Sequence, residues 1–455
     1  MKKAYFLLFM ATCMGFANVF AAEADPAPGV YVKAGSSGDG SSFDNAMGDI
    51  AIAVKDAKEK GLKFVYVADG DYSVAETLSV PAGITVVGEG DEVKLTVTAE
   101  KGDVVTLEQG TADAFARVEG LTIYGAKNGR GVKALNFGQV YNCVIENNKL
   151  GGQCAGKGDG GAGILLYAST LLERSIIRNN IADENVGGGI AVNGNNILVK
   201  NCLITGNKSL GKYINASGTE LKSSTGGILF WAGYNGNQFV NLTVVGNEGY
   251  NVGGVWLSGS KTKTRWVNSV VWGNKSTWPG EEDPDMQDDI YFKLNSGASL
   301  GIYKCFLPVI LKNNLDNDKV YAGVTQISTE NDPSDGELAG PRFTDPANGD
   351  YTLAAGSPLI DAGSEKDYDK DDADQIKVKT DLTIDGKLRK LGSHVDVGAY
   401  EYDENSSGII ATYPDFENET PVYYNLQGIR FNTMPTAAGI YIERRGSQNK
   451  KIIVK

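Results

Sequence analysis

The 455-residue chain has little of the chemistry on which most enzymes depend. It has a single histidine, His394, and it lacks the residue spacings of a zinc site, a phosphate-binding loop or a nucleophile elbow. Acids outnumber basic residues, and the formal net charge is −13. Nucleic acid is therefore not an expected partner, because phosphate binding needs a basic face. An anionic polysaccharide would need a bridging cation or a local basic patch.

Long hydrophobic runs are absent apart from one at the N-terminus. Residues 4–20 are mostly apolar, follow a pair of lysines and precede a cluster of small residues, which is the pattern of a secretory signal with its cleavage site. A retained membrane anchor is the alternative, but Gly15 and Asn18 interrupt the run, and a span needs roughly 20 apolar residues. We therefore expect residues 1–21 to be a signal peptide. The mature chain would be secreted or held at the cell surface, including the outer membrane, without spanning it.

Two short sequence phrases alternate along the rest of the chain. The first is a six-residue phrase that ends in branched apolar residues, and its copies are residues 118–123, 140–145, 172–177, 199–204, 239–244, 266–271 and 302–307. The second begins with glycine and a branched residue, and its copies are residues 131–134, 163–167, 189–193, 227–231 and 254–258, continued by 289–293. The spacing between copies varies, so the strands repeat while the loops absorb the difference, as in a solenoid.

The repeats predict an all-β chain in the form of a right-handed parallel β-helix. Strands that recur at a fixed place in a coil stack in register, and crossovers between parallel strands are right-handed. The expected interior ladders are Leu121, Cys143, Ser175, Cys202, Leu242 and Ser269, with Ile123, Ile145, Ile177, Ile204, Val244 and Val271 beside them. Asn142, Asn201, Asn241 and Asn268 are expected at sharp bends, because asparagine tolerates the left-handed backbone.

Four cysteines remain once Cys13 leaves with the signal, and an even number in an exported chain suggests disulfides. The repeat argues otherwise. Cys143 and Cys202 lie two coils apart, roughly 9.6 Å, whereas a disulfide needs α-carbons within about 7 Å. We expect both, and Cys305, to be free buried thiols.

The repeats and the entry segment at residues 31–43 resemble the pectate-lyase-like superfamily of right-handed parallel β-helix proteins, over roughly residues 28–403. The resemblance implies an N-terminal helix within residues 46–60 that caps the first coil and covers its open edge. Residues 342–351, 356–363 and 396–401 resemble the terminal coil of surface β-helix proteins. We take residues 25–403 as the β-helix domain.

The remaining residues, 404–455, resemble a different kind of domain. Residues 423–430, 439–442 and 450–455 are similar to the small β-sandwich sorting tails of Bacteroidetes proteins that the type IX system exports. The resemblance implies a small C-terminal β-sandwich-like sorting or anchor domain, with the export machinery as a partner.

The glycine-led phrase also predicts an outer stripe. If its branched residues point inward, the alternate residues point outward, and they include four large aromatics. The candidate ligand-binding residues are Lys133, Tyr167, Asn193, Trp231, Trp256 and Tyr291. Sugars present C–H faces to aromatic rings and hydroxyls to polar neighbours, so this stripe is a candidate glycan platform. The alternative is that the long loops after Asn148, Asn207 and Asn274 cover and bury it.

Catalytic residues are less well indicated. A lyase would need a cation and a basic residue, and a hydrolase would need paired carboxylates. Asp288 and Asp289 form the adjacent acid pair that enters the stripe, with a solvated acidic loop as the alternative. A dense acidic run at Asp367, Asp369, Asp371, Asp372 and Asp374 could hold Ca²⁺, but it lacks the glycine and closing glutamate of an EF-hand loop. No other cofactor is indicated.

Three functions fit these observations. The first is an exported protein that binds polysaccharide through the aromatic stripe. The second is a polysaccharide lyase or glycoside hydrolase whose acids come from the loops. The third is a structural adhesin or spacer without catalysis, which predicts a stripe covered by its own loops.

Overall fold

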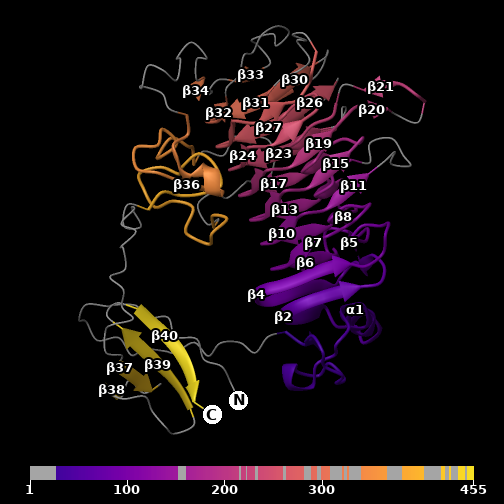
Figure 1. The fold of residues 1–455 in the computed structure, drawn as a ribbon, viewed down its shortest axis with the longest axis vertical. Coiled ribbons are helices and arrows are strands. Elements are labelled where there is room, and N and C mark those ends of the chain that lie inside the picture. The colour runs from indigo at the N-terminus through magenta and orange to yellow at the C-terminus, as the bar shows by residue number, and fades with distance from the viewer. Residues whose placement is uncertain are drawn as a thin grey trace. The chain divides into compact units, whose positions relative to one another are not determined.

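The computed structural model (Figure 1) describes a chain that is almost entirely β-structure. The described residues are 27–151, 160–214, 217–221, 223–230, 234–259, 263–280, 288–294, 299–307, 320–321, 325–326, 340–365, 382–403, 422–425, 430–431, 439–445 and 448–454. They fall into two units, of which the first runs to Leu353 and includes Ser357–Glu401. The second comprises Ala354–Gly356 and the chain from Tyr402 onward.

The first unit is a parallel β-helix in which successive coils add strands to several stacked ladders (Figure 1). The largest sheet holds two ladders. One contains β1 (Gly29–Val32), β2 (Phe64–Val74), β4 (Thr85–Val97), β6 (Arg117–Glu119), β9 (Gln139–Tyr141), β13 (Leu171–Glu173), β17 (Leu198–Lys200), β23 (Asn235–Val240), β27 (Lys263–Val267), β31 (Ser299–Tyr303) and β33 (Val320–Tyr321). The other contains β7 (Thr122–Tyr124), β10 (Val144–Glu146), β14 (Ile176–Arg178), β18 (Leu203–Thr205), β24 (Thr243–Val245), β28 (Val270–Trp272), β32 (Phe306–Leu307) and β34 (Thr325–Gln326).

Two further parallel sheets complete the coils. The second sheet contains β3 (Leu78–Val80), β5 (Val105–Leu107), β8 (Val132–Ala134), β12 (Ile164–Leu166), β16 (Ile190–Val192), β22 (Ile228–Phe230), β26 (Val255–Gly259) and β30 (Ile290–Leu294). The third contains β11 (Lys149–Gly151), β15 (Ile181–Asp183), β19 (Lys208–Leu210), β25 (Glu248–Gly249) and β29 (Lys275–Ser276). A short antiparallel hairpin, β20 (Tyr213–Ile214) with β21 (Glu220–Leu221), projects from one coil. The predicted fold class is confirmed.

The predicted interior ladders are in register. Ile145 pairs with Ile123 and with Ile177, and the ladder continues through Ile204 to Val244. These side chains are fully buried, so the period-two pattern of each phrase is satisfied by an apolar interior. Cys143, Cys202 and Cys305 are buried free thiols, as predicted. Burial raises the pKa of each thiol to about 12.

The predicted bends lie between the two ladders of the largest sheet. The φ angles of Asn142, Asn201, Asn241 and Asn268 are 50°, 53°, 54° and 47°, all in the left-handed region. Arg174 takes the same place in its coil at φ 49°. The bend therefore recurs even where asparagine does not.

A second asparagine ladder runs along the turn between the largest and third sheets. The asparagine recurs three residues after the six-residue phrase in the sequence, but the hydrogen bonds between its copies were not predicted. In each of its members the side-chain N–H donates to the amide oxygen of the next, at 2.8–3.0 Å, and the order is Asn148, Asn180, Asn207, Asn247 and Asn274. Glycines of the second phrase pack against it. A Cβ on Gly227 would lie 2.5 Å from the Gly254 carbonyl oxygen and 3.3 Å from Asn247 Nδ2. The glycine that opens each phrase is thus required by the close approach of neighbouring coils.

The predicted capping helix is α1 (Ile50–Glu59), which packs against β1 and β2 at the first coil (Figure 1). Asp49 caps its N-terminus by accepting from the main-chain N–H groups of Ala51 and Ile52 at 2.8 and 3.0 Å. Ala53 and Ala57 on its buried face join the main hydrophobic core. The helix therefore covers the apolar interior where the solenoid begins.

Residues 340–353, 357–365 and 382–401, here called the lateral segment, do not form a terminal coil as the resemblance implied. They contain the antiparallel pair β35 (Phe343–Asp345) and β36 (Asp350–Leu353), and they lie against the side of the largest sheet. The Ala399 N–H donates to Thr243 Oγ1 at 3.0 Å, and Asn268 exchanges hydrogen bonds with the Ser364 main chain. The physical reason is that the outward faces of β18 and β24 carry Leu203 and Val245, which this segment buries.

The second unit contains an antiparallel sheet in the order β38 (Arg430–Phe431), β37 (Val422–Asn425), β39 (Gly439–Arg445) and β40 (Gln448–Val454). Its predicted sorting role stays a prediction. The predicted signal peptide, Cys154, Trp231 and the acidic run at 367–374 lie outside the described residues. In the part of the chain that the structure describes, no helix is long and apolar enough to cross a membrane.

Candidate functional site

The outer face of the second sheet carries the predicted outward row, to which three of the six candidate ligand residues belong. Its strands pair in parallel without a register shift, so one outward side chain of each strand lies above the next. In order from β8 to β30 the row is Lys133, Leu165, Ala191, Leu229, Trp256 and Tyr291. The preceding residues, among them Ile164 and Ile228, belong to the buried core. The predicted alternation, with the branched residues of this phrase pointing inward and their neighbours pointing outward, is confirmed.

The middle of this row is covered by the protein's own loops. Leu165, Ala191 and Leu229 are 0% exposed, and Val186 and Tyr213 pack against Leu229. Tyr213 belongs to β20, so the projecting hairpin is one of the covering elements. The row is therefore not one continuous outer platform.

Trp256 and Tyr291 form the aromatic end of the row. Their rings are stacked, with centroids 6.1 Å apart and an interplanar angle of 21°. Both side chains are partly exposed, and Trp256 also packs against the Tyr213 cluster. Parallel register places the two residues directly opposite each other, which explains the stacking. The pair offers an apolar surface beside solvent.

The other predicted ligand residues are not gathered around this pair. Lys133 is partly exposed but lies four strands from Trp256, roughly 19 Å at the strand spacing. Tyr167 and Asn193 follow β12 and β16 and are partly exposed, and the Tyr234 hydroxyl donates to Asn193 Oδ1. The structure thus spreads the described members of the predicted set along the sheet and does not gather them at one place.

Asp289 continues the asparagine ladder. Its Oδ1 accepts from the main-chain N–H and the side-chain amide of Asn274, each at 2.8 Å. Burial raises the pKa of the Asp289 carboxyl, against the lowering effect of those hydrogen bonds, and the nearby Asp288 raises it further. Asp288 is exposed and accepts from the Ser276 main-chain N–H at 2.8 Å. Both acids therefore have capping partners, and a catalytic role for either stays a prediction.

No metal-binding constellation is found among the described residues, where no three acidic, histidine or cysteine side chains come together. Calcium binding by the acidic run at 367–374 stays a prediction.

An aromatic pair outside the predicted stripe was missed by the sequence interpretation. Tyr250 and Trp278 meet edge to face, with ring centroids 5.2 Å apart and an interplanar angle of 77°. The Lys212 ammonium lies 5.8 Å from the centre of the Trp278 ring, and it also forms an ion pair with Glu220 at 3.0 Å. A signal was available, because Tyr250 and Trp278 follow Asn247 and Asn274, successive members of the buried ladder.

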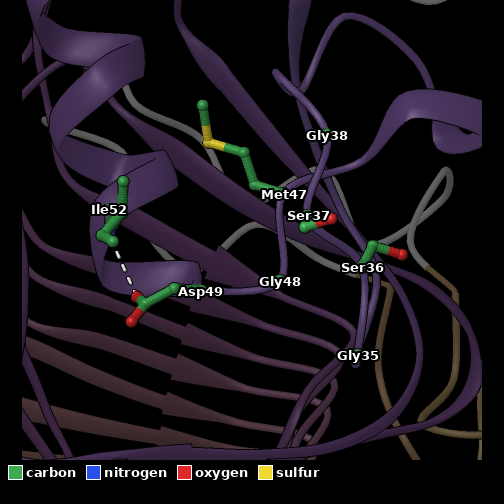
Figure 2. Close-up of a pocket in the computed structure, with 8 residues that line it drawn as sticks. All are labelled: Gly35, Ser36, Ser37, Gly38, Met47, Gly48, Asp49 and Ile52. Atoms are coloured by element: carbon green, nitrogen blue, oxygen red, sulfur yellow. Dashed lines mark hydrogen bonds between the residues drawn. The ribbon is translucent and has the colours of Figure 1, made fainter.

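A shallow hollow lies beside the capping helix (Figure 2). Its volume is about 510 Å³, and it is lined by Gly35, Ser36, Ser37, Gly38, Met47, Gly48, Asp49 and Ile52. Asp49 is the ionisable residue of this lining, and its carboxylate already caps α1. The hollow therefore presents mainly glycine backbone, two serines and apolar side chains.

A buried ion pair lies within the lateral segment. Arg389 is fully buried with its Nε 3.5 Å from Glu401 Oε1, and its Nη2 donates to the Asp396 carbonyl oxygen at 2.6 Å. Burial raises the pKa of Glu401 to about 8, although Arg389 lowers it, and Asp396 adds to the rise. These groups are enclosed and hold the segment together.

Comparison with known proteins agrees with this architecture. Residues 106–278 match the family model described as the right handed beta helix region. No curated protein matches the chain.

Three solved structures are similar at low identity. Pectate lyase Pel9A is 14% identical, with 82% of this chain and 96% of that chain covered and a TM-score of 0.36. The Dettilon tailspike protein is 14% identical, with 60% and 61% covered and a TM-score of 0.36. The catalytic domain of an α-1,3-glucanase in complex with nigerose is 11% identical, with 68% and 70% covered and a TM-score of 0.23.

Proposed function

We propose that this chain is an exported protein that binds polysaccharide on the outer face of its β-helix. Export would use the N-terminal signal peptide, and residues 404–455 would act as a type IX sorting or anchor domain, placing the protein outside the cell or on its outer surface. The observation that carries the proposal is the stacked, partly exposed pair Trp256 and Tyr291.

The chemistry of this pair suits a sugar ring. A pyranose has an apolar face of C–H groups and a rim of hydroxyls, so it packs on an aromatic ring while its hydroxyls bond to water or polar neighbours. Trp256 and Tyr291 lie on adjacent strands of a rigid parallel sheet, so their surface is fixed before a ligand arrives. Binding to such a surface needs no catalytic group.

The test is retention of the mature full-length chain on immobilised polysaccharides, with Trp256→Ala and Tyr291→Ala variants. We expect each variant to lose about tenfold in affinity, equivalent to ~1.4 kcal/mol, with unchanged near-ultraviolet circular dichroism. Tyr124→Ala, at another partly exposed aromatic residue, on β7, is the matched control and should bind as wild type does. Equal retention by all three variants would remove this pair from the binding site.

The structural spacer is the second candidate, favoured by the burial of Leu165, Ala191 and Leu229 under the protein's own loops. It predicts no retention on any polysaccharide by wild type. The lyase or hydrolase alternative predicts new unsaturated products or reducing ends in the same assay. Dependence of those products on Ca²⁺, or their loss in Asp289→Asn, would assign the activity.

A further inference from the structure

We infer that Tyr250, Trp278, Lys212 and Glu220 form a second sugar-binding subsite, specific for neutral sugars. The inference rests on the proposed function only in taking the ligand to be a glycan. It concerns a different surface, which lies next to the β20–β21 hairpin and is separate from the Trp256 and Tyr291 pair.

The hairpin relates the two aromatic surfaces. Its first residue, Tyr213, is buried in a cluster with Val186 and Leu229, and Trp256 of the second sheet packs against this cluster. The preceding residue, Lys212, places its ammonium over the ring of Trp278. Consecutive residues thus lie next to the two aromatic pairs: Lys212 over Trp278, and Tyr213 in the cluster against which Trp256 packs.

The backbone that carries the second pair is held by the coils. The Tyr250 N–H donates to the Ser209 carbonyl at 2.9 Å, and the Thr277 N–H donates to the Gly249 carbonyl at 2.8 Å. These bonds extend the third sheet beyond β25 and β29. Tyr250 and Trp278 are therefore partly exposed rings on a rigid support. Because their backbone is already ordered, binding a ligand costs less conformational entropy.

The polar groups supply both kinds of hydrogen-bonding capacity. Lys212 has three N–H donors and the Glu220 carboxylate accepts, and their side chains are 49% and 37% exposed. A sugar hydroxyl both donates and accepts, so one hydroxyl can contact each group while a C–H face covers Trp278. This combination of a ring with a donor and an acceptor fits a pyranose.

The charge balance selects the ligand class. Lys212 pairs with Glu220, and Lys208, on the adjoining strand β19, pairs with Glu248 at 2.9 Å. Each of these two lysines is paired with a glutamate. Exposed Lys275, on β29, lies in register beside Glu248, and its charge is offset by the exposed carboxylate of Asp288, which accepts from the Ser276 main-chain N–H. These groups therefore carry no excess of positive charge for a uronate carboxylate. A neutral glycan loses nothing by this pairing, whereas an acidic one would meet the two glutamates.

The experiment compares retention of the mature full-length chain on a neutral β-glucan, a neutral mannan and polygalacturonate. We expect Trp278→Ala to weaken binding to at least one neutral polysaccharide by about tenfold. Retention should change little between 50 and 500 mM salt, because exposed charges are screened at high salt and would not carry the binding. Tyr124→Ala should behave as wild type.

Two further variants separate binding from support of the hairpin. Trp278→Phe keeps an aromatic ring if the alanine variant unfolds, and it should retain most of the affinity. Lys212→Met keeps an unbranched apolar side chain at this position but removes the donors, so it should weaken binding without faster hydrogen exchange in residues 213–221. Faster exchange with unchanged retention would show that Trp278 only anchors the hairpin, and would overturn the inference.

The other outcomes are also decisive. Loss confined to polygalacturonate, with strong salt dependence, would contradict the neutral class. Unchanged retention in Trp278→Ala together with loss in Trp256→Ala would overturn this subsite and leave the proposed function intact. The reverse pattern would support this subsite and contradict the placement of the proposed site, and no retention by wild type would overturn both.

Discussion

Asp289 accepts two hydrogen bonds from Asn274, one from its main-chain N–H and one from its side-chain amide, both at 2.8 Å. The same two bonds join the earlier members of the ladder, for example from Asn247 to Asn274. Asp289 thus occupies an asparagine position with a carboxylate. One member of the adjacent acid pair that the sequence offered for catalysis therefore also supports the scaffold, and the catalytic role of the pair stays a prediction.

This relationship predicts how Asp289 variants fold. Asp289→Asn keeps an accepting oxygen and should alter the free energy of unfolding by less than about 1 kcal/mol, whereas Asp289→Ala should cost about 1–3 kcal/mol because Asn274 loses its acceptor. Urea unfolding of the mature chain measures both. Equal destabilisation by the two variants would mean that charge, and not the ladder geometry, is what the position requires.

The glycines that open the second phrase, here called the glycine column, predict a large loss of stability when a single methyl group is added. Gly227→Ala would place a Cβ 2.5 Å from the Gly254 carbonyl oxygen, so neighbouring coils must separate, and we expect a loss of about 2–4 kcal/mol. Gly273→Ala is the matched control, since its φ of 65° is strained but no atom lies within 4 Å. Its cost should be about 1 kcal/mol. Similar costs at the two positions would refute the packing argument.

The burial of the three thiols predicts that they react slowly with thiol reagents in the folded protein. In a Cys154→Ala background, Cys143, Cys202 and Cys305 should not react with a thiol reagent at pH 8 in the folded protein, because they are buried and their pKa is about 12. All three should react once urea unfolds the chain. Rapid labelling of any of them under native conditions would show that its coil opens.

The raised pKa of the Glu401 carboxyl predicts that the stability of the lateral segment depends on pH. Its pKa is raised to about 8 in the folded protein from an ordinary value near 4.5, so the folded state holds the proton more tightly than the unfolded state. This contribution to stability is fully present below pH 4.5 and is lost as the pH rises through 8. Glu401→Gln cannot ionise, so the difference between wild type and variant should change across that window.

Hydrogen exchange of residues 382–401 at pH 5, 7 and 9 is the appropriate measurement. Wild type should lose protection with rising pH more steeply than Glu401→Gln does. Parallel pH profiles for the two proteins would show that Arg389 keeps the carboxyl ionised throughout.

The solenoid could be predicted because its determinants are local. Within each six-residue phrase, the alternation of apolar residues shows which side chains point inward. The positive φ of Asn201 and Asn268 follows from the left-handed backbone that asparagine tolerates. The cysteine assignment followed from coil spacing alone.

The site was less accessible because its determinants lie in loops of unequal length. Tyr213 covers Leu229 from a hairpin that has no counterpart in the repeat, and this contact decides which part of the stripe meets solvent. The lateral segment was misjudged for a similar reason. Its partners, Thr243 and Asn268, precede it by about a hundred residues or more and carry no pattern that announces a contact.

The register of the ladders has an evolutionary consequence. Since the buried asparagines and the opening glycines recur from coil to coil, a whole coil can be gained or lost while these contacts between coils are kept, and the molecule lengthens or shortens by roughly 4.8 Å. Single residues within a coil have no such freedom, as the glycine column shows. Lineages of this protein should therefore differ by entire turns of the solenoid, with the aromatic surfaces displaced together as modules.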